Sequence, residues 1–527
     1  MKFFNTAGPT KCNKHYCLEP LDRIDLDEII SLISSEKYFI LHAPRQTGKT
    51  TCLLALMEYL NKREDYKCLY INVESAQAAR ENIYQGVSAI LNELASRALI
   101  YLNDSFPQSL LPSLLTEQRF GTALNECLTL WCNKISKPLV LLIDEIDSLV
   151  GDTLISVLRQ IRAGYDKRPS HFPQSIILCG VRDIRDYRIH SDKEKSIITG
   201  GSAFNIKAAS LKIEDFSKED IVKLYQCHTI ETGQEFEEGV FDLVWDLTCG
   251  QPWLVNALGY ETCFDIRRGR DRTKKITKDS IIEAKDNLIL RRETHLDQLV
   301  DKLKEERIKR VILPLLTSSE YPKDIPTDDI SYARDLGLIK TDGQIRISNL
   351  IYQETIPREL TYSTQITISH DPLWYIKEDG TLDIHKLLGA FQEFYRENSE
   401  IWLERFDYKE AGHHLLLQAF LQRIINSGGQ IIREYGLGMM RTDLFIIWFY
   451  GEKKEHKQKI VIELKMVHRS VEKTIEKGLI QTSKYMDKCQ TEDGHLVIFD
   501  KMNKSWEEKI FQKKMSCENK IIYVWGM

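Results

Sequence analysis

The sequence lacks any hydrophobic run that approaches the roughly 18 residues needed to cross a membrane as a helix. Its first nine residues contain no apolar core of the kind found in signal peptides. Internal repeats and low-complexity tracts are also missing. We therefore expect a cytoplasmic protein with no membrane segment.

Cysteine is sparse, and its positions form no regular framework. The chain has 12 cysteines in 527 residues, and several of them, such as Cys68 and Cys179, stand in runs typical of a buried core. We therefore expect reduced thiols. Cys12, His15 and Cys17 are close enough in sequence to suggest zinc, but no second pair of ligands follows at finger spacing. Loop packing is the interpretation we favour for these three residues.

An excess of positive charge is lacking as well, because 72 Lys and Arg residues stand against 77 Asp and Glu, for a net charge of −5. This balance argues against a protein that coats nucleic acid along its whole surface, so any contact with DNA must come from local patches. The length leaves room for about three or four domains with ample core.

The most specific motif that is present is a phosphate-binding loop near the N-terminus. Residues 43–50 match G-x-x-x-x-G-K-[ST], except that Ala43 replaces the first glycine. The apolar run 38–41 predicts a buried strand and 51–60 predicts a helix, so backbone N–H groups and the positive helix end point at phosphate. Lys49 is expected on the β and γ phosphates and the Thr50 hydroxyl on Mg²⁺. The predicted ATP-binding residues of the loop are Ala43, Pro44, Arg45, Gln46, Thr47, Gly48, Lys49 and Thr50.

A second strand, in 138–147, ends in adjacent carboxylates and has the pattern of Walker B. Asp144 is predicted to hold Mg²⁺ through a water molecule, and Glu145 to orient the water that attacks the γ phosphate. Asp147 is expected to cap the segment that follows. The loop and this strand together predict a nucleotide-hydrolysing site.

Two further strands end at the same sheet edge. The strand 175–179 is followed by Arg182 and Asp183, and either residue is a candidate sensor of the γ phosphate, with a plain salt bridge as the alternative. The strand 70–74 carries Asn72, which could restrain Glu145 until a partner binds.

The middle of the chain changes character after residues 205–207, where the strands are expected to stop. Residues 210–290 read as a helical lid in which Gly250 ends one helix and Pro252 starts the next. A helix ending at Gly337 and a β-wing at 343–347 predict a small winged helix. Its recognition-helix stretch has more acids than bases, so we favour intramolecular docking over DNA reading. Polar, irregular sequence from Thr361 to about Gly380 predicts a linker.

The C-terminal part predicts a helix (412–425), a hairpin (431–435 and 441–448) and a further strand (459–465). Glu463 and Lys465 lie two apart on one strand face, and Asp443 on the neighbouring strand can converge on them. Two carboxylates bind Mg²⁺ or Mn²⁺, and the lysine activates water or offsets charge on a phosphate. Acids and lysines also end ordinary strands as solvated residues, but the order of elements favours a metal site.

Five other residues near this region are candidates for a supporting or packing role. Gln481 and Tyr485, one helical turn apart, can support the site from the next helix, and Gln481 counts among the predicted catalytic residues. Glu434 is a candidate extra ligand. His413 and His414 are read as surface or packing histidines.

These motifs carry a resemblance to two families. The first two thirds, through Gln251, Pro252 and the winged helix, resemble the STAND-type P-loop ATPases of archaea and bacteria, within the wider AAA+ relatives. The last quarter resembles the PD-(D/E)XK nuclease superfamily, with Thr442 in place of its nominal proline. The resemblance implies a nucleotide-dependent switch that controls a nuclease, as in prokaryotic defence against foreign DNA and in mobile elements.

The expected fold is therefore an α/β P-loop NTPase core, a parallel sheet between helices, with a helical lid and a winged helix, followed by an α/β restriction-endonuclease-like domain. The expected divisions are an ATPase core (1–209), a lid (210–290), a winged helix (291–360), a connector (361–400) and a nuclease-like domain (401–527). Between Glu452 and Arg469, six basic residues stand against three acids, and 501–514 holds five lysines against two glutamates. Such runs modestly favour contact with DNA.

The function expected from the sequence is an ATP-binding and ATP-hydrolysing switch fused to a metal-dependent DNase, with Mg²⁺ at both sites and Mn²⁺ as an alternative at the second. Arg182 is included among the nucleotide-binding residues. A homo-oligomer or a protein trigger is a further expected partner. The alternative is a signalling or scaffold ATPase whose nuclease-like domain binds DNA or protein without cutting.

Overall fold

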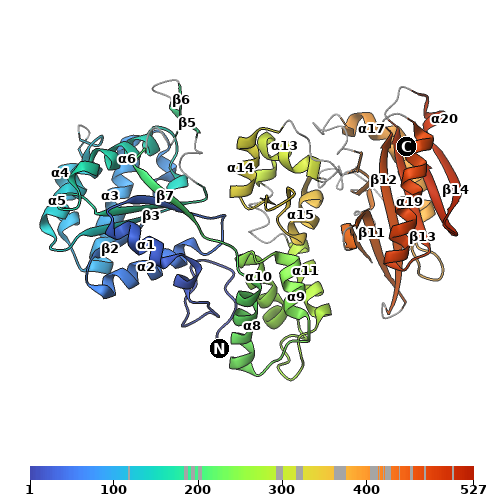
Figure 1. Ribbon diagram of the computed structural model, residues 1–527, viewed down its shortest axis with the longest axis horizontal. Helices are drawn as coiled ribbons and strands as arrows, with labels where there is room; N and C mark the ends of the chain where they lie inside the picture. The colour runs from blue at the N-terminus through green and yellow to red at the C-terminus, as the bar shows by residue number, and fades with distance from the viewer. Residues whose placement is uncertain are drawn as a thin grey trace. The chain divides into compact units, whose positions relative to one another are not determined.

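The structure, a computed structural model, forms two compact units (Figure 1). Unit 1 comprises Met1–Asp297 and Pro326–Asn349, and unit 2 comprises Gln298–Ile325 and Leu350–Met527. The residues described are 1–116, 119–182, 188–191, 196–199, 205–291, 301–315, 325–360, 375–403, 413–414, 416–418, 420–421, 429–437, 440–451, 455–467, 470–500 and 504–527. No helix in these ranges is long and apolar enough to cross a membrane.

Unit 1 is built on a five-stranded parallel sheet with the strand order β2-β3-β4-β1-β7. Strands β3 and β4 are buried along their whole length, which is typical of a parallel sheet covered by helices on both faces. The parallel α/β core is thus confirmed. Its strands are β1 (Tyr38–His42), β2 (Lys67–Asn72), β3 (Leu139–Asp144), β4 (Ser175–Gly180) and β7 (Lys207–Lys212). A separate two-stranded ribbon consists of β5 (Arg188–Ser191) and β6 (Ser196–Thr199).

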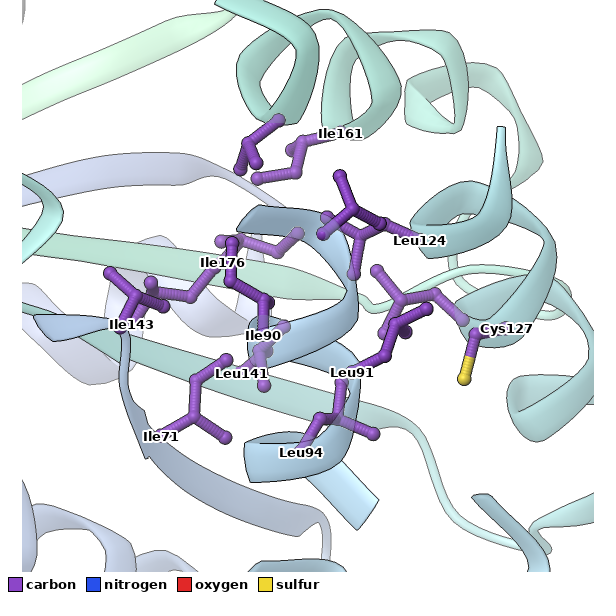
Figure 2. Packing of buried hydrophobic residues seen from close by; sticks show 14 of the residues in the cluster. Ile71, Ile90, Leu91, Leu94, Leu124, Cys127, Leu141, Ile143, Ile161 and Ile176 are labelled. Atoms are coloured by element: carbon purple, nitrogen blue, oxygen red, sulfur yellow. The ribbon is translucent and has the colours of Figure 1, made fainter. Parts of the chain in front are cut away.

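Alternate residues of the strands pack against different helix layers. On β2, Leu69 and Ile71 belong to one apolar cluster, whereas Cys68 and Tyr70 belong to the other. Figure 2 shows the first cluster, in which Ile71, Leu141, Ile143 and Ile176 of the sheet face helical residues. Helices of this layer are α3 (Ile83–Leu102), α4 (Phe106–Leu114), α5 (Ala123–Lys134) and α6 (Gly151–Ala163). The opposite layer contains α1 (Leu26–Ser34) and α2 (Lys49–Arg63).

Helix α3 offers a matched pair of leucines for testing this core. Leu91 is fully buried in the cluster of Figure 2, whereas Leu99 on the same helix is 42% exposed. We expect Leu91→Ala to destabilise the protein by about 2–5 kcal/mol, because it loses apolar burial and leaves a cavity. Leu99→Ala should cost within about 0.5 kcal/mol. Urea unfolding of the full chain measures both, and equal midpoints would contradict this packing.

The strands of unit 1 extend further along the chain than the sequence indicated. Strand β7 runs from Lys207 to Lys212, where the strands had been expected to stop. It was missed because it lies at the edge of the sheet beside β1, where a strand is only partly buried and needs few apolar residues. A helical segment follows, with Gly250 (φ 81°) before Pro252 as predicted. Its helices are α8 (Lys218–Thr232), α9 (Val240–Thr248), α10 (Pro252–Tyr260) and α11 (Lys278–Arg291), with a π-helical turn, η6 (Glu261–Asp265).

The segment Pro326–Asn349, here called the wing segment, belongs to unit 1. It contains α14 (Thr327–Asp335) and the antiparallel pair β8 (Ile339–Lys340) and β9 (Arg346–Ile347). Gly337 (φ 77°) follows the helix and Gly343 (φ 102°) lies between the two strands. The helix and the hairpin therefore occur where the sequence predicted them.

Unit 2 is built on a six-stranded mixed sheet with the order β10-β11-β12-β13-β15-β14. Its first three strands form an antiparallel meander, and β12 and β13 are parallel. The strands are β10 (Gly429–Leu437), β11 (Met440–Tyr450), β12 (His456–Val467), β13 (Asp493–Asp500), β14 (Phe511–Cys517) and β15 (Lys520–Gly526). The helices are α13 (Glu306–Leu315), α15 (Leu350–Leu360), α17 (Ile384–Leu403), α19 (Val471–Cys489) and α20 (Trp506–Lys509).

Helix α17 occupies much of the range predicted as a connector. Leu387 and Phe391 of this helix are buried in one apolar cluster with Ile460 and Ile462 of β12. The helix was missed because the connector was extended beyond the polar stretch from Thr361 to about Gly380, although the apolar residues of the helix recur at helical spacing. Residues 361–374, the start of the predicted connector, lie outside the described residues.

The cysteines differ in part from expectation. Cys12 and Cys17 form a disulfide, and the other ten cysteines are free thiols, as predicted for them. The pairing was not visible in the sequence because it depends on a tight turn that brings residues five apart together. His15 Nδ1 accepts the backbone N–H of Lys11 at 3.0 Å, which fits loop packing rather than a metal ligand.

Candidate functional site

The phosphate loop joins the buried strand β1 to helix α2. Ala43 is fully buried and its backbone N–H donates to the Gly180 carbonyl at 3.2 Å, so its methyl group packs where the usual glycine has none. The positive φ angles of the loop fall on Gln46 (58°) and Gly48 (93°), not on Ala43. An alanine is therefore accommodated without backbone strain.

Lys49 and Thr50 begin helix α2 at the base of this loop. The Lys49 ammonium is 5% exposed and donates to the carbonyls of Ala43 (3.1 Å) and Pro44 (3.0 Å). The Thr50 hydroxyl donates to Asp144 Oδ2 at 2.7 Å. The two predicted magnesium ligands, which follow β1 and end β3, are thus brought together at the carboxyl edge of the sheet, and their oxygens are the donors that Mg²⁺ prefers.

Asp144 is fully buried at the end of β3 and is held by three donors. Besides Thr50, these are the Tyr70 hydroxyl (3.1 Å to Oδ2) and the backbone N–H of Glu145 (2.9 Å to Oδ1). Tyr70 is a site residue that the sequence did not reveal, because a tyrosine inside an apolar strand has the pattern of ordinary core.

Glu145 follows Asp144 with φ 57°, a conformation that only the surrounding structure can hold for a non-glycine residue. Burial raises the pKa of its carboxyl group; Lys49 opposes that shift, and Asp147 and Asp144 add to it. A raised pKa suits a group that is to accept a hydrogen bond from, and orient, an attacking water.

The remaining residues at this edge differ from prediction in part. Asp147 does not cap the following segment: its Oδ1 accepts the backbone N–H of Val181 at 3.2 Å and so ties β3 to β4. Asn72 Oδ1 accepts the N–H of Glu74 at 2.8 Å, a local turn contact instead of a restraint on Glu145. Both side chains found nearer backbone partners. Asp183 lies outside the described residues.

Arg182 is covered by the wing segment. Its guanidinium lies over the ring of Tyr332, 4.8 Å from the centroid. Gly337 lies so close to the phosphate loop that a Cβ there would come within 2.9 Å of the Pro44 side chain. The wing segment therefore touches both the loop and the predicted sensor, which matches the expected intramolecular docking.

A second cluster lies in unit 2, on the sheet face that α19 covers. Val461 and Val467 of β12 pack with Ile475 and Leu479 of α19, so the odd-numbered positions of β12 face this helix. Phe445 of β11 belongs to the same cluster. By the same alternation Asp443, Glu463 and Lys465 project from this face.

Two side chains of this cluster are in contact, and the third bonds the backbone between them. Lys465 Nζ donates to Glu463 Oε1 at 2.6 Å, and Asp443 Oδ2 accepts the backbone N–H of Leu464 at 2.8 Å. Glu463 is only 2% exposed, and its Oε2 has no hydrogen-bond partner. A buried carboxylate oxygen without a donor is costly, and a cation would satisfy it.

The electrostatics agree with a cation site. Burial, and then the Asp443 carboxylate, raise the pKa of Glu463 to about 8. Burial alone would lower the pKa of Lys465, but the Glu463 and Asp443 carboxylates outweigh it and raise that pKa. Among the described residues no three His, Cys, Asp or Glu side chains gather as a metal cage. Two carboxylates suffice for Mg²⁺, which keeps several waters and takes further oxygens from substrate phosphate.

The supporting residues of the second cluster are placed as follows. Gln481 lies partly buried on α19, and its catalytic role stays a prediction. Tyr485 is buried among apolar residues of α19 and the sheet. His413 and His414 are packing residues, buried beside Phe499. The side chain of Glu434 lies outside the described residues.

Comparison with known proteins identifies the class of unit 1. Residues 32–187 match the AAA domain family. The chain therefore contains an AAA-type P-loop ATPase domain, which supports ATP binding and hydrolysis with Mg²⁺ as the usual cofactor. No curated protein matches the sequence.

Solved structures resemble the chain at low identity. A Walker-type ATPase of Pyrococcus abyssi is 15% identical with a TM-score of 0.45, covering 67% of this chain and 99% of its own. Cdc6p of Pyrobaculum aerophilum is 16% identical with a TM-score of 0.36, covering 68% and 97%. The RuvB Holliday junction branch migration motor of Thermotoga maritima is 11% identical with a TM-score of 0.32, covering 63% and 94%. At these TM-scores the function has to be argued from the site.

Nucleotide binding is measurable through stability. We expect Mg²⁺-ATP at about a hundred times its dissociation constant to add about 2.7 kcal/mol to the free energy of unfolding of the ATPase domain, because only the folded loop binds it. Lys49→Ala should abolish this protection, since the main point charge on the β and γ phosphates is lost. Thermal melting with and without millimolar ATP tests this. An unchanged melting curve for the parent protein would count against a functional ATP site and would suggest that Ala43, in place of the usual glycine, prevents binding.

Proposed function

We propose that the protein is an ATP-binding and ATP-hydrolysing switch that controls a metal-dependent deoxyribonuclease carried on the same chain. The observation that carries the nuclease half is the pairing of Lys465 with Glu463 on one face of a mixed sheet, beside Asp443, whose charge raises the pKa of Glu463. The ATPase half rests on the AAA match and on the contact between Thr50 and Asp144.

At the first site the residues divide the work of hydrolysis. The phosphate loop, through its backbone N–H groups and Lys49, holds and neutralises the phosphates. Thr50 and Asp144 would hold Mg²⁺, which would supply positive charge to offset that of the phosphates. Glu145 would orient the attacking water, and Arg182 would sense the γ phosphate once the ring of Tyr332, over which it lies, releases it.

At the second site the proposal rests on chemistry and topology together. An antiparallel meander, β10 to β12, is followed by a crossover helix, α19, and a strand parallel to β12, which is the order of elements that the resemblance to PD-(D/E)XK nucleases implies. Asp443 and Glu463 would hold Mg²⁺ or Mn²⁺, which polarises a phosphodiester and lowers the pKa of a bound water. Lys465 positions that water and offsets charge on the phosphate, and Gln481 supports the site from α19.

The proposed partners follow from this reading. DNA is the expected substrate, reached through local basic residues such as Lys509, Lys513 and Lys514 around β14. A STAND-type switch implies a protein trigger or a homo-oligomer, in the cytoplasm, with a role in defence against foreign DNA or in a mobile element.

Direct cleavage is the decisive experiment. The purified protein is incubated with plasmid DNA, linear DNA and RNA, in Mg²⁺ or Mn²⁺, with and without ATP. We expect cleavage that requires the metal and changes with nucleotide. If every DNA and RNA form stays intact under all these conditions, the nuclease reading falls and a signalling or scaffold ATPase, whose nuclease-like domain binds without cutting, takes its place.

A further inference from the structure

A short segment of unit 1, residues 214–216, connects the last strand of the parallel sheet to the first helix of the lid. We call it the hinge segment. It lies between β7, which ends at Lys212, and α8, which begins at Lys218. The N–H of Phe216 donates to the Gly250 carbonyl at 2.8 Å. Gly250 has φ 81°, and a Cβ there would come within 2.0 Å of the Phe216 carbonyl oxygen, so the hinge segment and the lid are packed without spare room.

Arg23 joins this hinge segment to the phosphate loop. Its Nη1 donates to the carbonyl of Thr47 at 2.5 Å, and its Nη2 donates to the carbonyl of Glu214 at 2.6 Å. The guanidinium also lies over the Phe216 ring, 4.6 Å from the centroid. It comes so close to the loop that a Cβ on Gly48 would be 2.9 Å from Nη1. One planar group therefore satisfies a loop carbonyl and a hinge carbonyl at once.

Lys340 of the wing segment holds the hinge segment from another element. Its ammonium lies 3.6 Å from Asp215 Oδ2 and donates to the Cys249 carbonyl at 3.2 Å. Cys249 precedes Gly250, the lid residue that bonds Phe216. Strand β8 thus contacts the hinge segment and the lid through a single side chain.

We propose that Arg23 is a positioning residue for the phosphate loop, and that Arg23 and Lys340 together couple nucleotide binding to the wing segment through the hinge segment. The inference rests on the ATP-binding part of the proposed function and is independent of the nuclease.

The physical basis is that each buried polar group of the loop needs a hydrogen-bond partner. When the amides of a phosphate loop face phosphate, its carbonyls must find other donors, and Arg23 supplies the donor for Thr47, a residue 1% exposed. Losing that donor leaves a buried carbonyl without a partner, which disfavours the loop conformation that binds phosphate. Because the same guanidinium holds Glu214, a shift of the loop on nucleotide binding moves the hinge segment. Lys340 also holds the hinge segment, so this side chain either opposes that movement or follows it.

A double-mutant cycle on ATP affinity tests the coupling. We expect Arg23→Ala to weaken ATP binding by about tenfold or more and Lys340→Ala to change it by at least about threefold. The double variant should differ from the product of the single effects by more than about threefold, because both residues act through the hinge segment. If the two substitutions only disturbed the structure independently, their effects on ATP affinity would multiply. Calorimetric titration of the full chain with ATP measures all four affinities.

Lys212→Ala is the matched control. Lys212 also pairs with the hinge segment, at 2.7 Å from the Glu214 carboxylate, but that pair is exposed and should contribute little. Arg23→Lys serves if Arg23→Ala fails to fold, since a lysine keeps the charge but reaches one carbonyl only, and it should weaken binding by about fivefold or more.

Three outcomes overturn the inference. The first is that the Arg23 variants bind ATP as tightly as the parent. The second is that the affinity of the double variant lies within twofold of the product of the two single effects. The third is a Lys212→Ala effect as large as that of Lys340→Ala. If the parent protein itself does not bind ATP, the proposed ATPase function is rejected instead. DNA cleavage that does not require ATP would bear only on the nuclease, and not on this inference.

Discussion

Replacing Lys465 by alanine is expected to reduce metal-dependent DNA cleavage by about a hundredfold or more, because the only cation seen to contact Glu463 among the described residues is lost. Asp443→Ala and Glu463→Ala should have effects of the same size. Under the proposed function the three side chains act as one unit, so combining two changes should cost little more than one. Gel assays of plasmid nicking and linearisation give the rates.

Lys457→Ala is the control for this set. Lys457 lies on the same strand, is exposed and packs over the ring of Phe449, so its removal should leave cleavage within about twofold. ATP turnover should survive all these changes, because the phosphate loop belongs to unit 1. Cleavage by Lys465→Ala at the parental rate would end the nuclease assignment.

Replacing Glu145 by glutamine is expected to keep ATP binding and to lower hydrolysis by about a hundredfold or more. The amide has nearly the same shape but cannot act as the carboxylate that orients the attacking water. Burial raises the pKa of Glu145, and Lys49 and Asp144 also influence it, so the substitution replaces a group that interacts electrostatically with both neighbours. Steady-state phosphate release, with affinity measured separately, distinguishes loss of chemistry from loss of binding.

Glu58→Gln provides the comparison for this prediction. Glu58 is exposed on α2, the helix that the phosphate loop opens, and should leave hydrolysis unchanged. If Glu145→Gln hydrolyses ATP at the parental rate, the assignment of Walker B is wrong.

Much of the ATPase domain was predictable because its signals are local. Lys49 and Thr50 stand at a fixed spacing between a buried strand and a helix, and Asp144 and Glu145 end another buried strand. The carboxyl ends of parallel strands meet at one edge, so contact between Thr50 and Asp144 follows once the strands are identified. The convergence of Asp443 on Glu463 was predictable for a similar reason, the two-residue period of neighbouring strands.

Other side chains found partners that no local pattern indicates. Asp147 bonds the backbone of Val181 rather than capping its own segment, and Asn72 bonds Glu74 rather than restraining Glu145. Short polar side chains have several backbone groups within reach, and the small differences between these depend on the exact backbone path. Helix α17 was placed within the connector although Leu387, Leu388 and Phe391 recur at helical spacing, and only the tertiary structure shows that they pack against the sheet.

The sequence by itself determined the phosphate loop, the Walker B strand, the lid with its Gly250 and Pro252 boundary, and the candidate carboxylates and lysine, since each depends on spacing within one or two elements. Only the tertiary structure decided that Arg23 bridges Thr47 and Glu214, that Tyr332 covers Arg182 and that Lys340 reaches Asp215. These contacts join residues that are distant along the chain, and periodicity carries no information about which distant segments meet. The packing of whole layers decides which segments meet. It therefore also decides which contacts link the nucleotide site to the rest of unit 1.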